Sequence, residues 1–146
     1  MHEHGPAGPA WAAALETSAL GQAMRESLWL YPAVELAHIL GFSLLIGAIV
    51  AYDLRLIAGR EAPAIAQRVA MFGLVLAAPA GLLLFTAEAT GYVHNTVFLL
   101  KLALIALALA NVALFHFGLS PSRFAGAASL GLWLGVLVCG RLIAYL

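Results

Sequence analysis

Four long apolar stretches occupy almost the whole chain beyond Trp29, and ionisable residues lie inside these stretches as well as between them. Hydrophobic residues make up 64% of the 146 positions, whereas charged residues make up only 10%. A soluble domain of this size needs more polar surface than this composition supplies. The apolar stretches therefore predict helices that cross a lipid bilayer.

The predicted spans cover residues 28–52, 65–87, 96–117 and 124–145. Each is about 22–25 residues long, which is enough to cross a hydrocarbon layer roughly 30 Å thick. Pro79 falls inside the second span and predicts a bend there. The loops between the spans are short, which favours an all-α fold in the form of an up-down four-helix bundle.

The segment before the first span has a different character. Residues 10–26 are helix-prone but too polar to cross a membrane, and they predict an amphipathic helix that lies on the membrane surface. Its apolar side would carry Trp11, Leu15, Leu20 and Met24. The chain thus divides into residues 1–27, a tail with an interfacial helix, and residues 28–146, a domain of four transmembrane helices.

The arginines outside the predicted spans indicate the orientation in the membrane. The loops after the first and third spans contain several of them, whereas the opposite side has only Arg25 outside the spans. Loops rich in Arg and Lys stay on the cytoplasmic side. We therefore expect a multi-pass protein of the bacterial inner membrane with both termini on the periplasmic side. The arginines that decide this are Arg55, Arg60, Arg68 and Arg123.

The charge balance limits the kinds of partner. Seven basic residues face seven acidic ones, the net charge is zero, and no basic run is present, so we expect no nucleic-acid partner. The expected partners are the lipid bilayer and other membrane or periplasmic subunits. The single cysteine, Cys139, is interpreted as a small buried hydrophobe.

Several ionisable residues are predicted to share the outer half of the membrane. A rise of about 1.5 Å per residue places Glu35 roughly 10 Å and His38 roughly 15 Å below the outer surface. On the same count Lys101 and Arg141 lie about 7–8 Å deep, and Glu88 lies near the rim. Because an ionisable group in hydrocarbon is costly, such a cluster indicates a functional site. The alternative is a structural charge network, in which Glu35 pairs with Lys101.

A second polar set is predicted near the inner surface. We interpret it as a solvated cytoplasmic rim that obeys the positive-inside rule, with His116 as an interfacial histidine. The set comprises Asp53, Arg55, Arg68, His116 and Arg123.

Copper suits the outer set best, because imidazole is a good copper ligand and few protein ligands are needed. His38 would bind the ion, Glu35 would bind or orient it, and His94 would capture it at the mouth together with the tail residues His2-Glu3-His4. Haem b on His38 is an alternative, although His116 lies at the wrong depth to be its second ligand. A proton relay through Glu35, His38 and Lys101 is a further alternative that needs no metal.

The run TGYVHNTVFLLKLALIALALAN, residues 90–111, resembles the copper resistance D membrane domain, in which a similar turn leads into a helix with an early lysine and a late asparagine. The preceding AGLLLF is similar to the Thr-Gly helix end of that family, with Ala80 in place of the threonine. The whole chain resembles an uncharacterised bacterial family of small four-helix integral membrane proteins, through residues 29–56 and 140–145. The resemblance implies a copper-handling or redox-linked membrane role beside a larger partner.

These observations predict a non-enzymatic membrane protein that handles copper or another redox metal. His38, Glu35 and His94 are the predicted metal residues, and Glu88, Lys101 and Arg141 form the predicted charge network around them. The alternatives are a membrane subunit of an electron-transfer complex that binds haem b or a quinone, and a structural accessory subunit of a larger membrane assembly.

Overall fold

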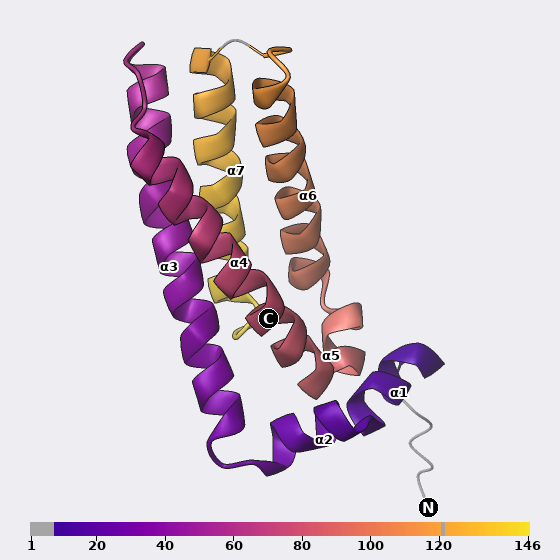
Figure 1. Cartoon of the computed structure of the whole chain (residues 1–146). Helices are drawn as coiled ribbons and strands as arrows, with labels where there is room; N and C mark the ends of the chain where they lie inside the picture. Colours follow the sequence, from indigo (N-terminus) through magenta and orange to yellow (C-terminus); the bar gives the residue numbers. More distant parts are fainter. Residues whose placement is uncertain (1–7, 121) are drawn as a thin grey trace, which may run out of the picture.

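The protein is all-helical in the computed structural model, which describes residues 8–120 and 122–146 (Figure 1). The described residues contain two short helices near the N-terminus, a short helix in the middle of the chain and four long ones. These are α1 (Ala10–Thr17), α2 (Ala19–Glu26), α3 (Leu30–Ile57), α4 (Ala64–Ala87), α5 (Ala89–His94), α6 (Thr96–His116) and α7 (Ser122–Leu142).

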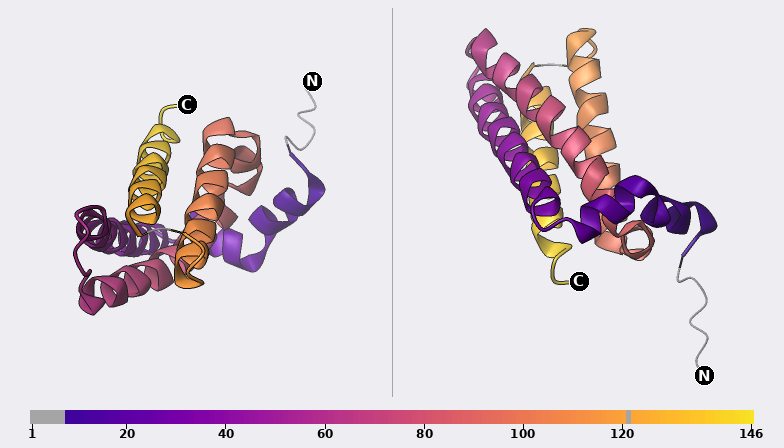
Figure 2. Two further views of the ribbon diagram at one scale, coloured as in Figure 1. Left: turned by 90° about the horizontal axis from the view of Figure 1, so that it is seen from above. Right: turned by 60° about the horizontal axis from the view of Figure 1, so that its bottom comes forward.

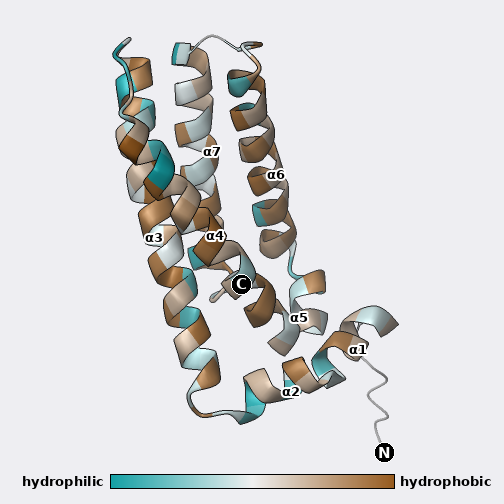
Figure 3. Ribbon diagram, viewed as in Figure 1, coloured by the Kyte–Doolittle hydropathy of each residue, from teal (hydrophilic) through white to brown (hydrophobic). Residues whose placement is uncertain are grey.

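The four long helices α3, α4, α6 and α7 are each long and apolar enough to cross a membrane. Their starts and ends agree with the four predicted spans to within a few residues, so the prediction of an all-helical, multi-pass membrane protein is confirmed. Apolar residues run along the length of these helices (Figure 3). Many large apolar side chains are exposed on them, as lipid-facing surfaces require, among them Phe72, Val75, Leu82 and Leu107.

Local signals in the sequence set the ends of these helices. Pro63 directly precedes α4, and the Asn95 side chain accepts hydrogen bonds from the backbone N–H groups of Val97 and Phe98 at the start of α6. Gly59 and Gly118 follow α3 and α6 with φ angles of 69° and 68°. In each case the next backbone N–H bonds back to the carbonyl five residues earlier, which closes the helix end.

The two connections α3–α4 and α6–α7 lie at one end of the molecule, which we call the loop end (Figure 1). The short helices α1, α2 and α5 lie at the opposite end. Of the long helices, α3 packs against α4 and α7, and α7 packs against α6. The view from above shows α7 between the α3–α4 pair and α6 (Figure 2). The backbones of α4 and α6 stay apart, and side chains bridge them near each end: Phe85 stacks on Phe98, and Gln67 contacts His116. We call this loosely packed side of the group of four the open side.

The contact between α3 and α4 is closest where two glycines face each other. A Cβ atom on Gly41 would lie 2.6 Å from the Ala77 nitrogen and 2.8 Å from the Gly73 oxygen. A Cβ atom on Gly73 would lie 2.5 Å from the Gly41 oxygen. Small residues let transmembrane helices approach to backbone contact in this way. Leu45, one turn beyond Gly41, begins the buried core, which it forms with Ala108, Trp133 and Val136.

The N-terminal segment differs from the single helix predicted over residues 10–26, because it forms two helices with Ser18 between them. Ser18 has an extended backbone, and its hydroxyl accepts a hydrogen bond from the Gly21 N–H at the start of α2. Such a cap favours a new helix over continuation of the old one. The residues GYVHN, which lie between the second and third predicted spans, also fall largely within a helix, the short α5.

Two side chains attach this segment to the end of α4 and the start of α5. The Glu16 carboxylate accepts hydrogen bonds from the backbone N–H and the hydroxyl of Thr90, both at 2.7 Å. The Arg25 guanidinium donates to the Ala87 carbonyl at 3.1 Å and to the Glu16 carbonyl at 2.5 Å. We call these contacts the N-terminal latch.

Candidate functional site

His38, the predicted metal ligand, lies on α3 against α4. Its Nδ1 is 2.8 Å from the Ala77 carbonyl oxygen, so the Nδ1–H tautomer donates to this carbonyl. The ring passes over Gly81, where a Cβ atom would come within 2.9 Å of His38 Cε1, and it stacks on Phe42. The glycine thus provides the space that the imidazole occupies.

Lys101 on α6 lines the same small cavity as His38, which has a volume of about 100 Å³. Its ammonium nitrogen is 6.0 Å from the centre of the Phe42 ring. It also lies close to Gly140, where a Cβ atom would be 3.7 Å away. The structure therefore brings two of the predicted outer residues, His38 and Lys101, into one cavity.

The other predicted outer residues lie outside this cavity. Glu35, Glu88, His94 and Arg141 are all exposed. The Arg141 guanidinium donates a hydrogen bond of 2.8 Å to the Tyr145 hydroxyl on its own C-terminal turn.

Glu35 and Glu88 affect the same phenol, that of Tyr92 in α5. The pKa of Tyr92 is raised, mainly by burial and then by its neighbours Tyr31, Glu88 and Glu35. Both carboxylates therefore lie near the Tyr92 phenol at the α1/α2 end of the molecule. The predicted pairing of Glu35 with Lys101 stays a prediction.

No group of three or more His, Cys, Asp or Glu side chains that could share a metal ion occurs in residues 8–120 and 122–146. Around His38 the neighbouring ionisable side chain is a lysine, which is not a copper ligand at neutral pH. The described residues therefore do not by themselves fit a copper centre, and copper at His38 would need donors from elsewhere. The tail residues His2, Glu3 and His4 lie outside the described part of the chain.

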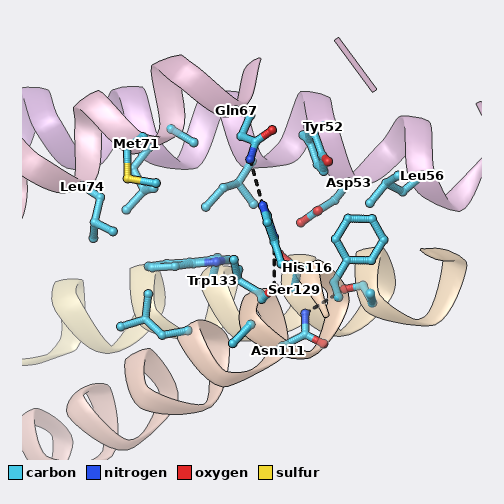
Figure 4. Close-up of a pocket in the computed structure, with 18 residues that line it drawn as sticks. Tyr52, Asp53, Leu56, Gln67, Met71, Leu74, Asn111, His116, Ser129 and Trp133 are labelled. Atoms are coloured by element: carbon cyan, nitrogen blue, oxygen red, sulfur yellow. Dashed lines mark hydrogen bonds between the residues drawn. The ribbon is translucent and has the colours of Figure 1, made fainter. Parts of the chain in front are cut away.

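A larger cavity of about 370 Å³ lies nearer the loop end and is lined by residues of α3, α4, α6 and α7 (Figure 4). Met71 on α4 and Val112 on α6 line it and are themselves exposed. These two residues carry the cavity wall to the outer surface between α4 and α6, in the stretch between the Phe85–Phe98 and Gln67–His116 contacts. Most of its lining is apolar, and its polar members are Tyr52, Asp53, Gln67, Asn111, His116, Ser129 and Trp133.

Two polar atoms in this lining are buried without a partner among the described residues. They are Oδ2 of Asp53, whose residue is 4% exposed, and the indole Nε1 of Trp133, whose residue is 3% exposed. One is an acceptor when ionised and the other is a donor. Asp53, Ser129 and the nitrogen-bearing side of Trp133 lie around the same space (Figure 4). In hydrocarbon no bulk water is present to satisfy such atoms, so a partner inside the cavity would stabilise them.

The remaining polar groups on the α6 side already have partners. His116 Nε2 is 3.1 Å from Gln67 Nε2, across the open side between α4 and α6. Its Nδ1 is 3.2 Å from the Val112 carbonyl oxygen. These two contacts fit the Nδ1–H tautomer, in which Nε2 accepts from the glutamine. Asn111 donates to the Ala125 carbonyl at 2.9 Å and so joins α6 to α7.

The residues that we predicted as an inner rim thus differ in their environments. Arg55 is exposed, as expected for a solvated rim, and so is His116, although it also lines the cavity. Asp53 is buried. Sequence reasoning missed Ser129 and Trp133, although they are spaced four residues apart and therefore lie on one face of α7. The signal that could have identified them is a polar residue four positions before a tryptophan within an apolar span.

Comparison with known proteins gives no relative from which a function can be transferred: no protein-family model, curated protein or solved structure matches the chain.

Proposed function

We propose that this membrane protein binds a lipid-soluble small molecule in the larger cavity between α3, α4, α6 and α7. The observation that carries the proposal is the shape and lining of that cavity. It is mostly apolar, contains a few convergent polar groups, and opens between α4 and α6 at a height where the surrounding surface is itself apolar. Ligand pockets of membrane and soluble proteins share this combination of apolar walls and few polar groups.

In this proposal the four long helices form an up-down bundle in the bacterial inner membrane, with both termini on the periplasmic side. The helices α1 and α2 lie at the membrane interface. The ligand enters laterally from the lipid, between α4 and α6. This corresponds to the sequence-based alternative in which the chain is a membrane subunit that binds a lipid-soluble cofactor.

Trp133 provides the means to test this proposal, because it lines the cavity. Replacing Trp11 and Trp29 by phenylalanine leaves Trp133 as the sole tryptophan of the chain. The probe is 1-bromo-4-pentylbenzene, an apolar quencher of indole fluorescence, added to the protein in lipid nanodiscs. We expect the quenching of Trp133 to saturate with quencher concentration, because the cavity holds a limited number of quencher molecules. Quenching by molecules dissolved in the lipid would instead rise linearly with concentration.

A matched pair of variants controls for general effects on the membrane. Ala113 lines the cavity, whereas Ala110 on the same helix is exposed and does not. Ala113→Phe should fill the cavity and abolish the saturating component, and Ala110→Phe should leave it intact. Quenching that is linear in all three proteins would show that the cavity takes no lipid-soluble ligand.

Copper or haem b at His38 remains the prediction from the sequence and from the resemblance to the copper resistance D membrane domain. What supports a site there is the convergence of His38 and Lys101 on the smaller cavity. The residues described around His38 provide too few donors for a complete metal centre. A further ligand from a membrane or periplasmic partner subunit would have to complete it.

A further inference from the structure

Resting on the proposed function, we infer that the ligand carries a hydroxylated aromatic head of the quinol type, one oxygen of which accepts the Trp133 indole N–H while an O–H group donates to Asp53. The inference concerns the polar end of the ligand and the two residues that recognise it. It is independent of the smaller cavity around His38.

We identify the two recognising atoms as the polar atoms of the cavity that lack a hydrogen-bond partner, whereas the polar groups of the α6 side have one. Gln67 and His116 bond to each other, and Asn111 bonds to a backbone carbonyl, so these groups are engaged within the protein. Oδ2 of Asp53 and Nε1 of Trp133 have no partner among the described residues and are more than nine-tenths buried. They come from different helices, α3 and α7, and line the same cavity. A ligand that reaches both atoms joins the two helices.

The chemistry of the pair argues against an acyl chain or an ion at this end of the cavity. An acyl chain offers neither a donor nor an acceptor. An anionic headgroup would meet the Asp53 carboxylate, and a cation would leave the indole N–H unpaired. A molecule with one O–H donor and a second oxygen acceptor satisfies both atoms.

The walls favour a flat aromatic body between the two oxygens. Trp133 and Phe115 both line the cavity and provide aromatic rings with which an aromatic ligand can pack. The lateral opening between α4 and α6 leaves room for an alkyl tail that extends into lipid. Membrane quinols and other lipid-soluble phenols share this chemistry, so the experiment has to distinguish the hydroxyl from the ring and tail.

Three probes with the same ring and the same pentyl tail separate these contributions: pentylhydroquinone, its dimethyl ether and pentylbenzene. Binding to the protein in nanodiscs is measured by isothermal titration calorimetry, without oxygen so that the hydroquinone stays reduced. We expect the hydroquinone to bind roughly tenfold more tightly than its dimethyl ether, because the ether cannot donate to Asp53. Pentylbenzene should bind most weakly, because it has no oxygen.

Two variants assign the two hydrogen bonds. Asp53→Leu removes the acceptor, so the hydroquinone should lose its advantage over the ether. Trp133→Phe removes the N–H but keeps a ring, so both oxygenated probes should bind roughly tenfold more weakly while pentylbenzene is little affected. Trp29→Phe is the matched control, because Trp29 is 82% exposed and lies far along the chain from the cavity residues.

The outcomes distinguish this inference from the function on which it rests. If the three probes bind equally well to the unmodified protein, the inferred head is wrong and the lipid-soluble ligand still stands. The same holds if Asp53→Leu retains the preference for the hydroquinone. If Asp53→Leu does not fold, Trp133→Phe alone tests the inference. An unchanged ranking of the three probes, with unchanged affinities for Trp133→Phe, would also overturn it. If no probe binds saturably, the proposed function itself fails.

Discussion

Two glycines control how closely the first two long helices approach. Gly41 and Gly73 bring the backbones of α3 and α4 into contact, and even one methyl group at either position would meet backbone atoms. We expect Gly41→Ala to lower the free energy of unfolding in detergent by about 1–3 kcal/mol, the usual cost of overpacking. Thermal or denaturant unfolding followed by circular dichroism measures this.

The same helix contains a control for that substitution. A Cβ atom on Gly47 would meet nothing within 4 Å. Gly47→Ala should therefore be neutral or slightly stabilising, because alanine is the better helix former. Equal destabilisation by both substitutions would show that helix contact at Gly41 is not the cause.

His38 provides a second prediction at this scale, which comes from the sequence. If it holds copper, His38→Ala should abolish stoichiometric copper in the purified protein, as measured by elemental analysis. His116→Ala should leave the copper content unchanged, because His116 lines the other cavity. A Soret band that disappears in His38→Ala would assign the site to haem instead. If the protein contains neither copper nor a chromophore, with or without the substitution, His38 has a structural role through its hydrogen bond to the Ala77 carbonyl.

Among the helices, the N-terminal latch responds to pH. The pKa of Glu16 is lowered from its ordinary value of 4.5, mainly by the hydrogen bonds from the Thr90 hydroxyl and backbone N–H. Because the folded-state pKa is the lower one, the latch contributes its full stability above about pH 4.5 and loses it as the pH falls through the folded-state value. The protection factors of amides in α1 and α2, which compare each exchange rate with the intrinsic rate at the same pH, should therefore fall on acidification below pH 4.5, while those in α3 change less.

A neutral side chain at Glu16 should reproduce the acid state. Glu16→Gln is expected to raise hydrogen exchange in α1 and α2 at pH 7 and to flatten its dependence on acid. Glu26→Gln is the control, since Glu26 is exposed at the end of α2. A fall in the protection factors on acidification that survives Glu16→Gln would assign the acid response to another group.

The helices also show what local sequence can and cannot predict. Hydropathy located all four long helices, and Pro63, Asn95, Gly59 and Gly118 explain where they begin or end, because these signals act within a few residues. The break at Ser18 was missed, because helix-forming residues on both sides of it conceal a cap that depends on one hydrogen bond, from the Gly21 N–H to the Ser18 hydroxyl. The hydrogen bonds of Glu16 to Thr90 and of Arg25 to Ala87 are tertiary contacts that periodicity does not encode.

For the whole molecule, the sequence indicated how deep each site residue lies in the membrane, but it did not indicate which helices pack around that residue. Depth counting assigned His38 and Lys101 to the same outer half of the membrane but to different depths, and the structure places both in one cavity. The same counting placed Asp53 near a surface but gave no information about which helices surround it. Its burial follows from the packing of α7 on α3, which is a contact between distant segments of the chain.

The orientation of the whole molecule is open to a direct prediction. With Cys139 replaced by alanine, a cysteine at position 60 should react with a membrane-impermeant maleimide only after the cells are opened, because the arginine-rich loops face the cytoplasm. A cysteine at position 146 should react in intact spheroplasts. The reverse pattern of labelling would invert the proposed topology and the depths assigned to every residue.

The pairing of α3 with α4 and of α6 with α7 has a consequence for biosynthesis. Each pair is joined by a short connection, and the α3–α4 pair has its glycine contact within a single stretch of residues 30–87. This pair can therefore close as a hairpin in the insertion machinery while the ribosome is still synthesising α6. The contact between α3 and α7 joins the first and the last of the long helices to be synthesised. It therefore forms last, when the α6–α7 hairpin docks on the α3–α4 hairpin.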